Sequence, residues 1–363
     1  MKRFLSGLSI VNFRGFKSFS SDKFRPVTII GGKNNCGKST LLEAICFVAN
    51  RANGAIPGRI TWSRGEKVKA RSLSSLFYGA NDEGEIDIHG VFSDESTRGV
   101  GLECTHKSAV DFKLQDGPPV NVNERLPFTY VQQYYTNRGG DVVGRGAMLI
   151  AFVKDEYRCY PLNPQADKSE YVKIDGRTTD DDWRCLYYQS QRKMDVSPVY
   201  AELFKTGSER SLLPYLQAVD SRVVDIAYDG TQLLCGVKNG KMRLPINVMG
   251  DGVVKVAEIL SILATSPKDS VLCLDEVENG LHHSVMKEAW KAFVCFAKER
   301  NVQLIVTTHN LELLKAIGEE TGCVGDGDFV YLNIVRRDND EVIAFPYDHQ
   351  ELAHSLSVNL EVR

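Results

Sequence analysis

Apolar residues follow two patterns along the chain, and each predicts a different kind of strand. Mostly apolar runs occur at Val27–Ile30, Val271–Leu274 and Val302–Thr308, which is typical of strands buried in a parallel sheet. Polar and apolar residues alternate over Glu85–Phe92, and another β-like segment follows at Gly99–Glu103, which predicts an antiparallel layer. The chain is therefore expected to be an α/β protein with both kinds of sheet.

Helix-period apolar positions occur directly after the first buried run, at Leu41–Val48, and again at Val253–Ala264. The same period over Val199–Leu216 is interrupted at Thr206–Ser208, which predicts two helices rather than one. Before the first buried run, the N-terminal residues are expected to contain one strand, Leu8–Asn12, followed by a polar turn.

Weaker signals predict the remaining elements. Asn239-Gly240 lies between two β-like runs and predicts a hairpin turn. Tyr187–Lys193 is aromatic and basic, and a solvated loop or helix face is favoured there over a contact with nucleic acid or a partner. A short helix is expected at Leu73–Tyr78 and an amphipathic segment at Gln350–Leu356. Strands are also expected at Val110–Leu114, Phe128–Tyr134, Gln232–Val237, Met242–Val248, Phe329–Val335 and Glu341–Phe345.

Composition places the chain among soluble globular proteins. Its 363 residues, 43% of them hydrophobic and 25% charged, suffice for one large or two moderate domains. No apolar run approaches bilayer length, and the N-terminus carries no secretory signal, so a cytoplasmic location without a membrane partner is expected. A net charge of −3 argues against a uniformly basic nucleic-acid binder, although that sum would hide a local basic face.

The nine cysteines show no C-x-x-C spacing. They are expected to be reduced, mostly buried thiols, including Cys36 and Cys273 near the motifs described next. Zinc is the alternative, but no cluster of cysteine and histidine has ligand spacing.

Residues 32–39, GKNNCGKS, match G-x-x-x-x-G-K-[ST] between a strand and a helix. Small residues let backbone N–H groups turn toward phosphates, and the following helix N-terminus adds positive charge. Lys38 can reach the β- and γ-phosphates, and the Ser39 hydroxyl can ligate Mg²⁺. ATP and Mg²⁺ are thus the expected ligands, with nucleotide contacts predicted for Gly32, Asn34, Asn35, Cys36, Gly37, Lys38, Ser39 and Thr40.

Two carboxylates end the buried run Val271–Leu274. Asp275 is expected to hold the Mg²⁺ shell, and Glu276 to polarise a water for in-line attack on the γ-phosphate. Acids after a buried strand are common, but together with a phosphate loop they predict catalysis.

Two phrases carry a family resemblance. Residues 10–16, IVNFRGF, precede the phosphate loop, and residues 275–282, DEVENGLH, follow the acidic strand. The chain resembles the ABC-like ATPase heads of the SMC, recombination-repair and OLD-type families, and is most similar to standalone ATPases of antiphage systems such as the PARIS-type component. The resemblance implies an ABC-like P-loop NTPase head with a mixed central sheet, an antiparallel β layer and an inserted helical lobe.

The resemblance also implies roles for particular residues. Arg14 would contact the nucleotide, unless it is a solvated surface arginine, and His309 would sense the γ-phosphate, unless it caps the next helix. Gln132 would join Mg²⁺ to the attacking water, although its neighbour Gln133 competes for that place because adjacent strand side chains face opposite sides. Four residues would form a divergent signature that binds the nucleotide of the opposite subunit, with an N-cap turn as the alternative: Met249, Gly250, Asp251 and Gly252. The charge of Asp251 means that this contact would use backbone N–H groups.

The expected organisation is two parts of one ATPase head, residues 1–135 and 196–363, with residues 136–195 an insertion of unassigned structure. The leading hypothesis is an ATPase that alternates between conformations as a head-to-tail dimer or higher oligomer. By analogy it would control a separately encoded effector such as a nuclease or toxin. The alternatives are a nucleotide-gated scaffold with negligible turnover, and a DNA-repair or SMC-like head, which predicts long heptad arms between the two parts that this chain lacks; whether DNA is bound stays open.

Overall fold

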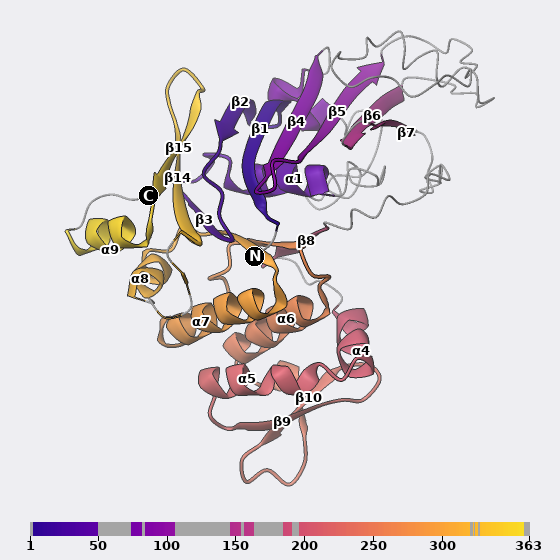
Figure 1. Cartoon of the computed structure of the whole chain (residues 1–363). Coiled ribbons are helices and arrows are strands. Elements are labelled where there is room, and N and C mark those ends of the chain that lie inside the picture. The colour runs from indigo at the N-terminus through magenta and orange to yellow at the C-terminus, as the bar shows by residue number, and fades with distance from the viewer. Residues whose placement is uncertain are drawn as a thin grey trace.

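In the computed structural model, two six-stranded sheets lie on either side of helix α1 (Lys38–Ala49), and a helical lobe lies on the opposite side of the central sheet (Figure 1). The structure describes residues 3–49, 74–81, 84–105, 146–153, 156–162, 184–190, 196–319, 322, 324–325 and 327–358. The predictions for Val110–Leu114, Phe128–Tyr134, Gln132 and Gln133 lie outside these residues.

The central sheet has the order β15-β14-β3-β13-β12-β8 and is mixed, because β15 alone runs antiparallel to its neighbour. Its strands are β3 (Val27–Gly31), β8 (Cys185–Gln189), β12 (Val271–Asp275), β13 (Gln303–Thr307), β14 (Phe329–Arg336) and β15 (Val342–Tyr347). The three apolar runs thus form adjacent parallel strands as predicted. Because parallel strands end at one edge, the segments after β3, β12 and β13 meet there.

Strand β8 corrects the interpretation of Tyr187–Lys193 as a solvated loop or helix face. Residues 185–189 pair in parallel with β12, with Gln189 opposite Asp275. The aromatic residues at 187 and 188 hid a strand that is too short for its period to be recognised.

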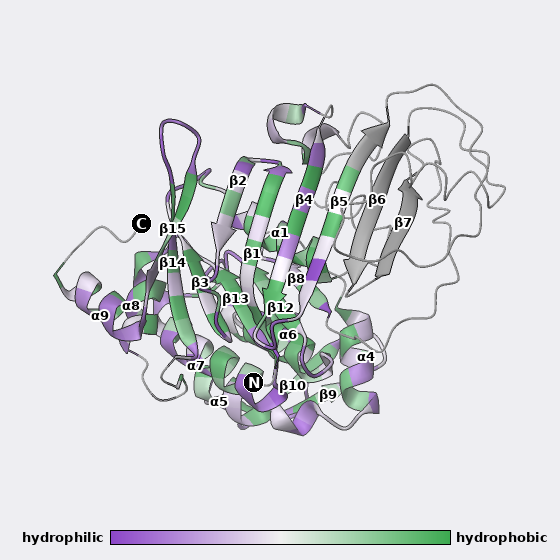
Figure 2. Ribbon diagram, turned by 45° about the horizontal axis from the view of Figure 1, so that its top comes forward, coloured by the Kyte–Doolittle hydropathy of each residue, from purple (hydrophilic) through white to green (hydrophobic). Residues whose placement is uncertain are grey.

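The second sheet is antiparallel, in the order β2-β1-β4-β5-β6-β7. It contains β1 (Leu5–Phe13), β2 (Phe16–Ser21), β4 (Glu85–Phe92), β5 (Thr97–Thr105), β6 (Gly146–Val153) and β7 (Glu156–Leu162). The predicted antiparallel layer is confirmed, and polar and apolar residues alternate along β1 and β4 (Figure 2). The polar turn expected after Phe16 is wrong there, because residues 16–21 form β2, which pairs with β1. Strands β6 and β7 come from the segment that had no assigned structure.

Alternate residues of the central strands enter two separate cores. Ile30, Val271 and Ile305 face α1 and the antiparallel sheet. Ile29 and Leu272 face the helices on the other side. This two-sided burial explains why these strands are mostly apolar and do not alternate between polar and apolar residues.

The helical side contains α4 (Ser197–Lys205), η4 (Glu209–Ser211), α5 (Leu213–Val219), α6 (Asp251–Thr265), α7 (His283–Arg300), α8 (Leu311–Glu319) and α9 (His349–Ser357). The predicted break at residues 206–208 is confirmed. A small sheet of β9 (Val223–Tyr228), β10 (Leu233–Val237) and β11 (Leu244–Pro245) is attached to them.

Three local predictions need correction. The strand expected at Met242–Val248 pairs only at Leu244–Pro245 and continues as η5 (Ile246–Val248), because Pro245 offers no N–H to extend a ladder. Instead of a helix at Leu73–Tyr78, the described residues form two single 3₁₀ turns, η2 (Ser74–Leu76) and η3 (Tyr78–Ala80). Cys295 is disulfide-bonded, so the expectation of reduced cysteines is wrong there.

Among the described residues, no helix combines the length and the apolar character needed to cross a bilayer.

Candidate functional site: a nucleotide site at the edge of the central sheet

The phosphate loop joins β3 to α1 and is shaped by two glycines in the left-handed region. Gly32 has φ +131° and Gly37 has φ +106°, which glycine adopts without a steric cost. A Cβ on Gly37 would lie 2.5 Å from the Phe16 ring, and one on Gly32 would lie 2.3 Å from the Ile334 carbonyl oxygen. The loop is therefore pressed against β2 and β14, which gives Phe16 of the N-F-R-G-F phrase a physical role.

Side chains of the loop divide into those that face solvent and those that face the core. Asn34 and Asn35 are exposed, whereas Cys36 and Thr40 are buried. The buried pair could contact a nucleotide only through backbone N–H groups. The Lys38 ammonium lies within the loop and donates to the carbonyl oxygens of Gly32 at 2.7 Å and of Lys33 at 3.0 Å.

Asp275 ends β12 and is the centre of a polar network. Its Oδ1 accepts hydrogen bonds from Ser39 Oγ at 3.1 Å and Thr307 Oγ1 at 2.6 Å, and its Oδ2 accepts one from Tyr187 OH at 3.1 Å. Ser39 and Asp275, 236 positions apart, thus present a hydroxyl and a carboxylate oxygen side by side. These are the hard oxygen donors that Mg²⁺ prefers, so the residues fit this ion.

Glu276 follows with a left-handed backbone, φ 51°. Its N–H donates to Thr307 Oγ1 at 2.8 Å, and its Oε2 accepts a hydrogen bond from Asn279 Nδ2 at 2.8 Å. The carboxylate is oriented by Asn279 and remains partly exposed, at 29% of the side chain. A partly exposed and oriented carboxylate can accept a proton from a water.

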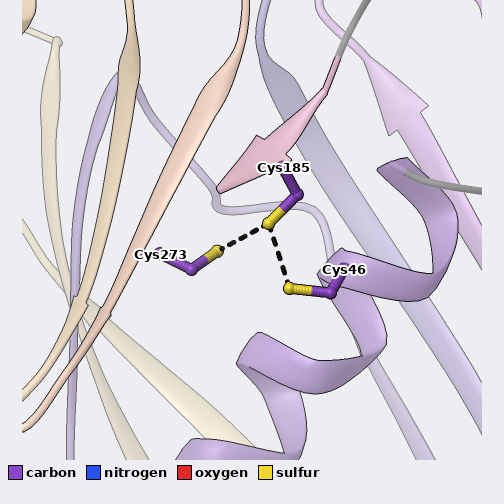
Figure 3. Close-up of side chains that lie close together, drawn as sticks. All are labelled: Cys46, Cys185 and Cys273. Carbon is purple, nitrogen blue, oxygen red and sulfur yellow. Dashed lines mark hydrogen bonds between the residues drawn. The ribbon is translucent and has the colours of Figure 1, made fainter. Parts of the chain in front are cut away.

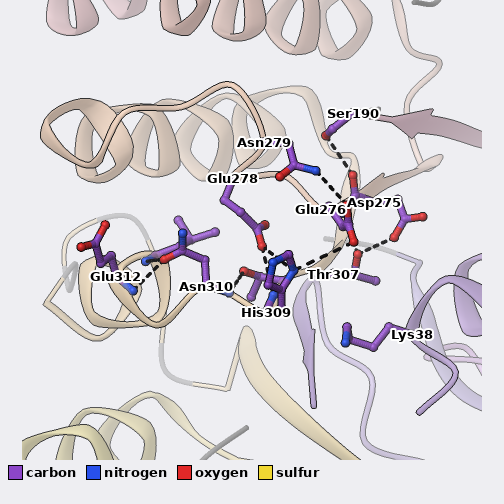
Figure 4. A network of polar contacts seen from close by, with 12 residues as sticks. Lys38, Ser190, Asp275, Glu276, Glu278, Asn279, Thr307, His309, Asn310 and Glu312 are labelled. Carbon is purple, nitrogen blue, oxygen red and sulfur yellow. Dashed lines mark hydrogen bonds and ion pairs between the residues drawn. The ribbon is translucent and has the colours of Figure 1, made fainter. Parts of the chain in front are cut away.

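His309 follows the T-T-H end of β13 and is held by Glu278. The His309 N–H donates to Glu278 Oε1 at 3.0 Å, and its Nδ1 lies 3.2 Å from the same oxygen and 4.0 Å from Glu276 Oε1. The His309 side chain is 46% exposed, whereas that of Glu278 is 3% exposed. Figure 4 shows these residues with Lys38 around the carboxyl ends of β12 and β13.

Strand β8 supplies site residues that the sequence interpretation missed. Gln189 ends β8 opposite Asp275, and its Nε2 donates to Tyr187 OH at 3.0 Å. Burial, and then the charge of Asp275, raise the pKa of Tyr187, so its hydroxyl stays protonated and donates. Gln189, rather than Gln132, is the described glutamine beside Asp275. The available signal was C-L-Y-Y-Q, a short β-like run ending in glutamine.

Arg14 lies against the phosphate-loop helix. Its Nε forms an ion pair of 2.7 Å with Glu43 Oε2, and both side chains are largely buried, at 10% and 0% exposure. This position excludes a solvated surface arginine. A direct contact between Arg14 and nucleotide stays a prediction.

Lys255 of α6 links three parts of the site. Its Nζ donates to the Asn279 carbonyl oxygen at 2.9 Å and contacts Ser190 Oγ, and it lies 5.1 Å from the centre of the Tyr188 ring. Ser190 Oγ in turn donates to the Asp275 carbonyl oxygen at 2.9 Å. A buried ammonium thus connects the helix that follows Gly250 to the loop that carries Glu276, and no sequence motif indicated it.

The signature-like turn opens α6 and lies beside the segment that follows Glu276. Residues of both border a hollow of about 490 Å³ together with the end of α5. Its lining residues are Val219, Asp220, Gly250, Asp251, Gly252, Val253, Gly280, Leu281, His282 and Val285. Lys38, Ser39 and Asp275 are not among them.

Three features meet at one edge of the mixed sheet: a phosphate loop, an acidic strand end and a T-T-H strand end. They define the fold as that of a P-loop NTPase head of the SMC type. An antiparallel sheet covers the phosphate-loop helix, and a helical lobe lies on the other side of the central sheet.

Comparisons with known proteins agree with this class. Residues 4–181 match the family described as "AAA ATPase domain", and residues 221–315 match "AAA domain, putative AbiEii toxin, Type IV TA system". A Helicobacter pylori protein called ATP/GTP phosphatase is 24% identical over 372 residues, covering 96% of this chain and 97% of the relative.

A solved structure has a similar fold. An SMC head bound to the C-winged helix domain of ScpA aligns with a TM-score of 0.50 at 12% identity, covering 95% of this chain and 98% of that one. The SMC head domain from Thermotoga maritima aligns with a TM-score of 0.49 at 15% identity, covering 95% and 99%. Fold, motifs and family models together support a P-loop ATPase.

Proposed function

We propose that this protein binds ATP with Mg²⁺ and hydrolyses it to ADP and phosphate, and that the cycle drives a conformational switch. The observation that carries the proposal is the contact of Ser39 with Asp275, beside Glu276 and His309. The hydroxyl, the adjacent carboxylate and base, and the sensor come from three segments remote in the chain, and a purely structural role would not require all four side chains at one sheet edge.

Each residue then has a defined task. Lys38 leaves its carbonyl partners to bind the β- and γ-phosphates, and backbone N–H groups of the loop bind the remaining oxygens. Ser39 and Asp275 would hold Mg²⁺, which neutralises phosphate charge when it is bound. Glu276, oriented by Asn279, accepts a proton from the water that attacks the γ-phosphorus, while the P–O bond to ADP breaks. His309 and Gln189 are placed to contact the γ-phosphate and the water.

The signature-like turn is proposed to act on a second chain. The hollow beside Gly250 and Gly252 is bordered by the loop after Glu276, not by the phosphate loop of the same chain. Gly250 caps α6, so backbone N–H groups at the helix N-terminus are available to an anion. Asp220 and Asp251 also line the hollow, which favours binding by these N–H groups over side chains. A head-to-tail dimer would complete both nucleotide sites.

The proposed role of the switch is to control a separate effector, such as a nuclease or toxin, in bacterial antiphage defence. The toxin–antitoxin description of the family matched by residues 221–315 supports this. The cytoplasm, where ATP is supplied, is the proposed location.

An SMC-like role on DNA is the second candidate, favoured by the likeness to an SMC head bound to part of ScpA. Addition of DNA to the purified protein separates the two, because an SMC-like role predicts that turnover responds to DNA.

Replacing Glu276 by Gln tests catalysis directly. Glu276→Gln keeps the hydrogen bond to Asn279 possible but removes the base, so we expect phosphate release to fall by at least about 100-fold with ATP binding retained. Release of phosphate and binding of labelled ATP are measured on the same preparation. Glu341→Gln, an exposed carboxylate paired with Arg337, is the matched control.

Two results would contradict the proposal. An unchanged rate in Glu276→Gln removes the catalytic assignment. Negligible turnover in the wild-type protein with intact ATP binding supports the nucleotide-gated scaffold instead.

A further inference from the structure

Three cysteine thiols from distant parts of the chain meet beneath the nucleotide site. Cys46 lies in α1, Cys185 in β8 and Cys273 in β12 (Figure 3). The Cys185 sulfur is 3.0 Å from that of Cys46 and 3.5 Å from that of Cys273, and all three lie within 4.8 Å of one another. Among the described residues, no other group of three or more His, Cys, Asp or Glu side chains has its possible ligand atoms this close together.

We propose that Cys46, Cys185 and Cys273 bind one thiophilic divalent cation of the zinc class. Thiolate sulfurs are the soft ligands that select such ions. With a metal–sulfur distance of about 2.3 Å, tetrahedral geometry places two sulfurs about 3.8 Å apart. Two of the separations found here, 3.0 and 3.5 Å, are shorter than that value, and the third is at most 4.8 Å, so each sulfur needs to move by less than about 1 Å to share one ion.

The three residues differ in burial. Cys46 and Cys273 are buried, at 4% and 0% exposure, whereas Cys185 is half-buried. Binding of the ion releases protons. Three thiols and one divalent ion give a tris-thiolate complex, and the buffer takes up the three protons. A disulfide needs sulfurs about 2.05 Å apart and would use only two of the three thiols.

The ion would tie together elements that carry nucleotide ligands. Cys46 lies in the same helix as Lys38 and Ser39, Cys273 lies two residues before Asp275, and Cys185 begins the strand that ends at Gln189. A bound ion would therefore stabilise the packing of α1 on β8 and β12 by mass action. This site needs no ATP, so it can exist whether or not the protein hydrolyses nucleotide.

Cadmium provides the test, because its thiolate complexes absorb in the ultraviolet. The full chain is reduced with a phosphine, freed of metal, and titrated with Cd²⁺ or Zn²⁺ without nucleotide. We expect one ion per chain by native mass spectrometry and a thiolate-to-cadmium absorbance band that corresponds to three sulfurs. Cys46→Ser and Cys185→Ala should weaken binding by at least about tenfold. Cys235→Ser, a buried thiol in the other core, should bind as the wild type does.

Several outcomes would overturn the proposal. These are no thiolate band in the wild-type protein, equal affinity in Cys46→Ser, or a chain that holds no ion and whose peptide map shows a disulfide between two of these three cysteines. If Cys46→Ser does not fold, the band of the wild-type protein and the Cys185→Ala variant still decide. ATP hydrolysis is measured separately, so failure of the metal site leaves the proposed function untouched.

Discussion

Lys255 has an uncommon environment for a lysine, since it is only 6% exposed. Burial lowers its pKa to about 8, although Glu258, Glu278 and Glu276 act in the opposite direction. The Tyr188 ring also faces it, and the Tyr188 hydroxyl donates to Glu258. The ammonium therefore loses its charge in a range where enzymes are assayed, and with the charge it loses the strong hydrogen bond to Asn279.

The first prediction follows from this titration. ATP turnover should fall as pH rises through about 8, because Asn279 orients Glu276 less well when its carbonyl oxygen loses a charged donor. Lys255→Met should lower kcat about tenfold at pH 7 with little change in KM, which is the size expected for one charge-assisted bond. Lys255→Arg stays charged and should abolish the decline between pH 8 and 9. The pH profiles of phosphate release for the three proteins provide the measurement.

Comparing the wild type with Lys255→Arg separates Lys255 from other titrating groups, which both proteins share. Identical profiles in these two would remove Lys255 from the orientation of Glu276. As the pH rises, the free energy of unfolding and the ATP turnover change in opposite directions. Between about pH 8 and 10.4 the unfolded chain binds a proton at Lys255 that the folded chain lacks, so this residue makes the free energy of unfolding rise with pH.

Individual residues differ in how far the sequence could place them. Lys38, Ser39, Asp275 and Glu276 belong to contiguous motifs whose chemistry requires their spacing, so they could be named in advance. Lys255 and Tyr187 act through tertiary contacts with Asn279 and Asp275, which are 24 and 88 positions away. No local pattern encodes such contacts. Gln189 could not be named in advance, because only the sheet order shows that its strand lies beside Asp275.

At the scale of elements, long buried strands and helices were predictable because their period is sustained over many residues. Strand β8 was not, since its five residues include two tyrosines with different surroundings. The Tyr187 hydroxyl donates to Asp275, whereas that of Tyr188 donates to Glu258 of α6. Opposite faces of one short strand thus serve the nucleotide site and the helical lobe.

These adjacent tyrosines allow a matched pair of variants. Tyr187→Phe removes a donor from Asp275 and leaves that carboxylate less well oriented, so we expect kcat to fall about tenfold and the Mg²⁺ requirement to rise. Tyr188→Phe removes a hydroxyl that donates to Glu258 but keeps the ring beside Lys255, so its turnover should stay within about twofold of the wild type. Turnover is measured across a Mg²⁺ titration, with thermal unfolding as the check on folding. Equal losses in both variants would show that β8 has only a structural role.

At the scale of the whole molecule, the α/β head with its mixed sheet, antiparallel layer and helical lobe was predictable because the motifs occur in a fixed order along it. The division into residues 1–135, 136–195 and 196–363 stays a prediction. The structure adds that β6, β7 and β8, all from the middle segment, pair with strands of both sheets. Pairing between segments so far apart has no signature in a single sequence, because strand order is set by the assembled sheets.

The head-to-tail arrangement makes a prediction that no single variant can test, because it concerns which chain supplies each half of a site. Lys38→Ala lacks a working phosphate loop but keeps its Gly250 turn. Gly250→Leu keeps the phosphate loop but fills the hollow. The φ of −61° at Gly250 accepts a side chain, and nothing lies within 4 Å of the added Cβ, so the chain should fold.

Each variant alone should be nearly inactive. If the turn acts on the opposite chain, a mixed dimer contains one site in which both halves are intact. Half of the dimers in an equimolar mixture are mixed, and one site in two is intact in each, so about a quarter of the wild-type rate should return. If the turn acts on its own chain, every site in the mixture has a defect and no rate returns. Phosphate release before and after mixing, with exchange of subunits verified by native mass spectrometry, therefore decides between a composite site and one built by a single chain.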